Sequence, residues 1–146
     1  MRAFASLLVL ACASGAAHAQ GSCGNFGSAC GVPSISCTGA PTIGTTFEIV
    51  LPGTPGAPML LVVGPPTNPT PLVPFPYACI PPGCPLLAFP LVSILRPVGP
   101  QAQAVFDLPV PDNPALVGAI LAAQGWTASP GAPCAYASPG LRITLG

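Results

Sequence analysis

The chain has 146 residues, of which 51% are hydrophobic and only 4% are charged, with three positive and three negative side chains and no lysine. Its one histidine, His18, lies among the first nineteen residues, so the rest lacks the bases of Ser-His, Cys-His and Ser-Lys catalysis and the amine of Schiff-base chemistry. Two remaining arginines make no basic patch for nucleic acid, and there is no glycine-rich phosphate loop with its lysine.

The first nineteen residues have the layout of a secretory signal peptide. Arg2 supplies the positive charge, residues 3–17 form an apolar stretch, and Ala17-His18-Ala19 is a small-x-small cleavage site. Cleavage there leaves Gln20 as the N-terminus and predicts a secreted protein, extracellular or in the cell envelope. A lipoprotein signal with Cys12 as the lipidated residue is the competing interpretation, but its apolar region is short.

The 127 residues after the signal peptide suffice for one domain. They contain 23 Pro and 16 Gly, a proportion also found in disordered chains. However, 35 of them are Leu, Ile, Val or Phe, and their net charge is about −1, so we expect a folded chain. We divide it into a Gly/Ser-rich N-terminal segment at 20–31 and a domain at 32–146. The apolar run Met59 to Val63 is too short to cross a membrane.

Short strands bounded by Pro or Gly recur along the domain. Apolar and polar residues alternate in Thr45–Leu51, where Phe47, Ile49 and Leu51 share one face. The run Met59–Val63 is apolar on both faces, as in the middle of a sheet. The proline-rich stretch Gly64–Pro85 is predicted to be a loop. Further strands are predicted at 86–95 with an interruption at Pro90, at 103–110 and at 141–145.

The segment that begins at Asn113 fits two structures. Asn113 is a good N-cap and Pro114 a good first helical residue, and a helical stripe of apolar residues follows. The same residues also fit a strand at Val117–Thr127, and the pattern alone slightly favours the helix. About seven short strands with turns between them predict an all-β fold, an antiparallel immunoglobulin-like β-sandwich.

Six cysteines follow the signal peptide: Cys23, Cys30, Cys37, Cys79, Cys84 and Cys134. An even number in an exported chain predicts disulfides, here three, in a pairing that the sequence alone does not determine. A local Cys79–Cys84 bond is plausible, because Pro82-Gly83 between them suits a type II turn. A metal site is disfavoured, since these residues include no histidine and no Cys-x-x-Cys pair, and we expect no metal and no cofactor.

Carboxylates are the remaining candidates for acid–base catalysis, as in glycoside hydrolysis. Glu48 and Asp107 both point outward on predicted strands and would share one face if those strands were neighbours. Asp112 lies in a predicted turn between two prolines. A solvated polar face that keeps an apolar domain soluble is the simpler interpretation, and we expect no catalytic residue.

Aromatic residues are the candidate ligand contacts. Phe75 and Tyr77, in Pro74-Phe75-Pro76-Tyr77, are held on stiff backbone where rings can stack on sugars or receive a peptide. Packing onto the core beneath a disulfide-pinned loop is the alternative that we favour. Trp126 is expected in the core.

Several motifs occur in order between Cys30 and Gly146. They are the stretches at 41–47, 55–64, 83–87 (Gly-Cys-Pro-Leu-Leu), 109–118 (Pro-Val-Pro-Asp-Asn-Pro-Ala-Leu-Val-Gly) and 138–145 (Ser-Pro-Gly-Leu-Arg-Ile-Thr-Leu), with Gln124 and 130–132 between the last two. Together they resemble a family of small secreted modules from planctomycete-type bacteria. The resemblance implies a β-sandwich, a short turn at Asn113–Val117 leading into a strand, and a bond between Cys30 and Cys84. It implies no activity.

We therefore expect a non-catalytic secreted or cell-surface module with a structural or adhesive role. The alternative is a carbohydrate- or peptide-binding module that uses Phe75 and Tyr77, and a carboxylate-dependent glycoside hydrolase is a remote third. The corresponding partners are a cell-surface polysaccharide or another extracellular protein.

Overall fold

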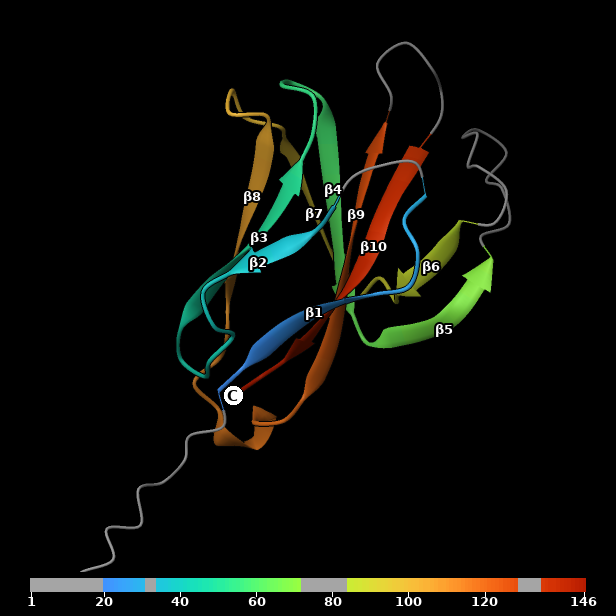
Figure 1. Ribbon diagram of the computed structural model, residues 1–146. Helices are drawn as coiled ribbons and strands as arrows, with labels where there is room; N and C mark the ends of the chain where they lie inside the picture. Colours follow the sequence, from blue (N-terminus) through green and yellow to red (C-terminus); the bar gives the residue numbers. More distant parts are fainter. Residues whose placement is uncertain (1–19, 31–33, 72–83, 129–134) are drawn as a thin grey trace, which may run out of the picture.

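The computed structural model describes residues 20–30, 34–71, 84–128 and 135–146 (Figure 1). These residues form three antiparallel sheets, ordered β1-β10-β9-β4-β7, β2-β3-β8 and β5-β6. The strands are β1 (Ser22–Phe26), β2 (Ser36–Thr38), β3 (Thr46–Pro52), β4 (Pro58–Gly64), β5 (Pro66–Pro71), β6 (Pro85–Ala88), β7 (Val92–Pro97), β8 (Gln103–Pro109), β9 (Ile120–Ala128) and β10 (Ala135–Thr144), with a 3-10 turn η1 (Pro114–Leu116). In this part of the chain no helix has the length and apolar character needed to span a membrane.

The main hydrophobic core lies between the five-stranded and the three-stranded sheets. Phe47, Ile49 and Leu51 alternate along β3 and are all buried, as is Phe106 on β8. The facing sheet contributes Met59, Leu61, Val63, Ala123, Leu141 and Ile143 to the same cluster. The alternation predicted for β3 is therefore confirmed, the strand predicted at 103–110 is found as β8, and the two sheets pack face to face.

The five-stranded sheet also carries apolar residues on its other face. Met59 and Leu61 of β4 enter the main core, whereas Val62 packs with Ala88 of β6 and Ala122 of β9. The two-stranded sheet therefore covers part of the outer face, away from β3 and β8 (Figure 1). This second layer explains why β4 is apolar on both faces.

Gln124 attaches β6 to the five-stranded sheet through its buried carboxamide. Its Oε1 accepts a hydrogen bond from the Leu87 N–H at 3.0 Å, and its Nε2 donates to the carbonyls of Pro85 at 3.0 Å and Ser138 at 3.1 Å. A bulge in β10 interrupts the β9–β10 ladder there, and the Ser138 hydroxyl accepts from the Gly125 N–H at 2.8 Å. The Gln124 and Ser138 side chains thus supply hydrogen bonds to backbone groups that the interrupted ladder leaves without a strand partner. Buried backbone groups need such partners.

Two disulfides cross-link the described strands. Cys23–Cys37 joins β1 to β2, with Cα atoms 6.4 Å apart, and Cys30–Cys84 joins the segment after β1 to the start of β6, with Cα atoms 5.4 Å apart. The Cys30–Cys84 bond is the one that the resemblance implied. The local Cys79–Cys84 bond is wrong, because folding of β6 onto the outer face brings Cys84 to Cys30. The two cysteines without a described bond, Cys79 and Cys134, lie outside the described residues.

Three strands, β1, β2 and β5, occupy segments where no strand was expected. β1 lies in the Gly/Ser-rich segment and pairs with β10 from Ser22 to Phe26. β5 lies in Gly64–Pro85, so the prediction of a loop was wrong for Pro66–Pro71. Proline donates no backbone hydrogen bond, and β5 accordingly lies in a two-stranded sheet whose register shifts between Pro66 and Thr70.

The segment that begins at Asn113 forms one short turn and then a strand. The Asn113 Oδ1 accepts a hydrogen bond from the Ala115 N–H at 3.0 Å, and Pro114 is the first residue of the turn. Asn113 and Pro114 therefore take the N-cap and first positions that the sequence predicted for a helix. The turn ends at Leu116, and the chain continues into β9, which pairs with both β4 and β10. The helix interpretation was wrong, because hydrogen bonding and burial in a central strand outweigh local propensity.

Candidate functional site

The two larger sheets are cross-linked along one side and open along the other. On the cross-linked side, the edge strands β1 and β2 are joined by Cys23–Cys37. On the opposite side lie the edge strands β7 and β8, where the Arg96 Nη1 donates to the Val105 carbonyl at 2.8 Å. We call the surface formed by β7 and β8 the open side.

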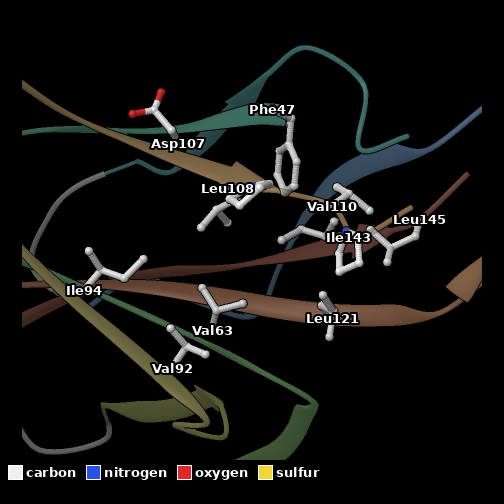
Figure 2. A pocket seen from close by; sticks show the side chains of 12 residues that line it. Phe47, Val63, Val92, Ile94, Asp107, Leu108, Val110, Leu121, Ile143 and Leu145 are labelled. Carbon is white, nitrogen blue, oxygen red and sulfur yellow. The ribbon is translucent and has the colours of Figure 1, made fainter. Parts of the chain in front are cut away.

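An apolar cleft of about 330 Å³ lies between the sheets on the open side (Figure 2). Its volume is at the lower end of the range for ligand pockets. Val92 and Ile94 of β7, with Val63 and Leu121 of the same five-stranded sheet, lie across the cleft from Leu108 of β8 (Figure 2). The remaining lining residues are Phe47, Asp107, Pro109, Val110, Pro111, Ile143 and Leu145. The cleft is therefore lined almost wholly by carbon.

Charged side chains lie at the rim of the cleft. Arg96 and Asp107 form an ion pair of 3.5 Å that connects the two sheets, and their side chains are 47% and 55% exposed. Because both are solvated, the pair contributes at most about 1 kcal/mol to stability. The Arg96 guanidinium also lies 5.9 Å from the centre of the Phe106 ring. Arg96 is therefore held against β8 by contacts with a carbonyl, a carboxylate and a ring.

The two carboxylates considered for acid–base chemistry are direct cross-strand partners. β3 pairs with β8 so that Glu48 lies opposite Asp107, and both side chains are exposed. The expectation that neighbouring strands would place them on one face is confirmed. Asp112 lies elsewhere, exposed and beside Gly44. The carboxylate pair is thus solvated, and in Figure 2 Asp107 points away from the apolar cleft.

Replacing Glu48 with glutamine is expected to raise the free energy of unfolding by about 0.2–1 kcal/mol, because like charges directly opposite on a sheet repel. Urea unfolding at low salt measures the gain, which should shrink in 1 M salt. The same replacement made in an Asp107→Asn background is the control and should give no gain. A loss of stability at low salt would contradict repulsion between the two carboxylates.

Sequence reasoning missed the exposed apolar side chains of the open side. Phe89, Leu91, Val92 and Leu95 are each more than half exposed, and they lie on β7 or in the turn before it. This interval was predicted only as an apolar stretch interrupted at Pro90. A short apolar strand with Pro90 and Pro97 at its ends could have indicated this exposure. Proline is tolerated in strands at the edge of a sheet, where side chains are more exposed.

The other candidates have different positions. Trp126 is half-buried and packs against both the Cys30–Cys84 cluster and the Val62 cluster. Phe75 and Tyr77, the proposed ligand contacts, lie outside the described residues. Within the described ranges, no three His, Cys, Asp or Glu side chains are grouped so that they could hold a metal ion. The open side is therefore the surface on which the described residues combine a cleft with exposed apolar groups.

The chain matches no known protein-family model, no curated protein and no solved structure.

Proposed function

We propose that the chain is a non-catalytic extracellular module with a structural or adhesive role, exported by the signal peptide at 1–19. Its two disulfides support an oxidising compartment. Two sheets packed around one core support an immunoglobulin-like β-sandwich as the fold type. The resemblance to secreted modules of planctomycete-type bacteria is part of the same proposal.

The apolar character of the open side is the observation that carries this proposal. The cleft has an aliphatic lining, and Val92, which is part of that lining, is 52% exposed. Its nearest charges, Arg96 and Asp107, neutralise each other. A surface of this kind binds a partner by burying apolar area. The partner is another extracellular protein or a cell-surface polysaccharide.

The solvated state of the carboxylates supports a non-catalytic role. Glu48 and Asp107 are exposed to water, whereas the two carboxyl groups of a glycosidase flank the scissile bond of a bound sugar. Hydrolysis of a panel of nitrophenyl glycosides tests this part directly. Any turnover that disappears in the Glu48→Gln/Asp107→Asn variant would show that the chain is a hydrolase.

Adsorption to phenyl-agarose tests the apolar contact. We expect the mature oxidised protein to adsorb, and the Val92→Asp variant to bind about tenfold more weakly. One lost valine contact is worth about 1.5 kcal/mol, and a carboxylate at the mouth of the cleft opposes apolar contact. Adsorption isotherms at fixed salt measure the change.

Val117→Asp is the matched control, because Val117 is 50% exposed and Val92 is 52% exposed. Val117 lies just after η1, outside the lining of the cleft. Thermal unfolding shows whether both variants are folded. Equal weakening by the two substitutions would show that adsorption does not use the open side.

A further inference from the structure

β7 lies at the end of the five-stranded sheet, and its outer edge has no pairing strand among the described residues. The Val98 N–H, just after β7, donates to the Ala57 carbonyl at 2.9 Å, so the even-numbered residues of β7 direct their backbone groups to β4. Ser93 and Leu95 therefore direct theirs away from β4. No described strand pairs with that edge.

The central part of this edge lacks the usual protection against pairing. Edge strands are commonly guarded by proline or by a charge. Here Pro90 and Pro97 lie only at the two ends, and the Arg96 side chain is bonded to Val105 on β8. Residues 91–95 carry no charge, and Leu95 is 68% exposed.

We propose that β7 pairs antiparallel with β7 of a second copy of this chain, around a two-fold axis at Ile94. In this register Ser93 lies opposite Leu95 of the second copy, and the two residues exchange N–H···O bonds in both directions. Ile94 then lies opposite Ile94 of the second copy. The pair joins the two five-stranded sheets into one continuous sheet.

The arrangement of charges fits this pairing of identical strands. Arg96 lies opposite Val92 of the second copy, so no like charges face each other. The two Arg96 residues are roughly 14 Å apart along the strands, beyond the screening length of about 8–10 Å. Each remains paired with Asp107 of its own chain.

The apolar area also fits a second copy. Leu91, Val92, Leu95 and Phe89 are each more than half exposed along or beside the edge. Eight such side chains and two backbone edges would bury on the order of 1,000 Å², near the lower limit for a specific interface. This pairing does not depend on the proposed adhesive role.

A cysteine at the two-fold axis tests the register. In the mature oxidised protein, Ile94→Cys is expected to form a disulfide-linked dimer under mild oxidation, seen on a non-reducing gel. Facing residues of a non-hydrogen-bonded pair have Cα atoms about 4.5 Å apart, within reach of a disulfide. Ser93→Cys is the control, because the two Ser93 residues are diagonal neighbours roughly 7–8 Å apart. Equal cross-linking of both variants, or of neither, would overturn the register.

The mass in solution tests the pairing itself. Sedimentation equilibrium of the mature protein is expected to show twice the chain mass at high micromolar concentration. Ser93→Pro removes only an outward-facing N–H and should weaken the dimer at least tenfold, whereas Ser93→Ala should leave it intact. A wild-type protein that stays monomeric at these concentrations would overturn the proposal, and would leave the edge free for a different extended partner.

The proposed adhesive role and the dimer can fail separately. Val92→Asp is expected to weaken adsorption to phenyl-agarose but to preserve the dimer, because the carboxylate that it places opposite Arg96 of the second copy offsets the apolar area that it removes from the interface. Ser93→Pro should weaken the dimer and leave the cleft unchanged. Loss of the dimer in Val92→Asp would contradict the register.

Discussion

Removal of the Cys30–Cys84 disulfide by a double alanine replacement is expected to lower the free energy of unfolding by about 4 kcal/mol. The bond connects residues 54 positions apart and keeps β6 on the outer face of the five-stranded sheet. Without it, the unfolded chain gains the entropy of a long open loop. The Cys23–Cys37 bond closes a separation of only 14, and the same model gives about 3 kcal/mol for it.

Urea unfolding of the two double variants under oxidising conditions measures both losses. Thiol titration of the unfolded, unreduced mature wild-type protein, which lacks Cys12, is the control, and it should detect at most two free thiols, those of Cys79 and Cys134. A larger loss for the Cys23–Cys37 variant would contradict the dependence on loop length. Four free thiols in the mature wild-type protein would contradict one of the two bonds, and six would contradict both.

Local sequence pattern predicts a strand well when one face of it is buried. Phe47, Ile49 and Leu51 alternate with polar residues, and their side chains enter the core as the period of two requires. β1 has no such alternation, because its residues 22–25 are small or polar and Phe26 is its only large apolar residue. Its strand conformation comes from pairing with β10 and from the Cys23–Cys37 bond, both of which are long-range.

The candidate site depends on the order of the strands, which alternation does not encode. The prediction for Glu48 and Asp107 could only be conditional, because nothing in the sequence shows that β3 and β8 are neighbours. The exposure of Leu95 follows from the position of β7 at the end of its sheet. Apolar residues of the same kinds are mostly buried in β4, which is a central strand.

The two sides of the paired sheets differ in a way that bears on function. Cys23–Cys37 links the edges covalently on one side, whereas on the open side Arg96 links them by a hydrogen bond and a solvated ion pair. Solvated pairs of this kind contribute little to stability, so a partner that binds at the open side displaces little polar bonding between the sheets. This asymmetry supports placing the proposed contacts at β7 and β8.

Replacing Gln124 with methionine is expected to lower the free energy of unfolding by roughly 3 kcal/mol or more. Methionine has a similar volume but leaves the Leu87 N–H and the Pro85 and Ser138 carbonyls without their bonds. Each buried polar group that loses its partner costs about 1–3 kcal/mol. Urea unfolding measures the loss, and Gln103→Met, at an exposed position on β8, is the matched control. Equal effects of the two substitutions would contradict the role of Gln124.

Replacing Gln124 with glutamate is expected to make stability depend on pH. A neutral carboxyl can accept from the Leu87 N–H and donate to one of the two carbonyls, whereas an ionised carboxylate faces both carbonyls with no proton to donate. Burial and these carbonyls therefore raise the pKa of the introduced carboxyl in the folded protein above its unfolded value of about 4.3. The variant keeps its stability below about pH 4.3 and loses it as the pH rises through the folded-state pKa. Urea unfolding midpoints of the variant and of wild type, compared at pH 4 and at pH 7, measure the change. A variant as stable as wild type at pH 7 would show that the site of the Gln124 carboxamide is open to water.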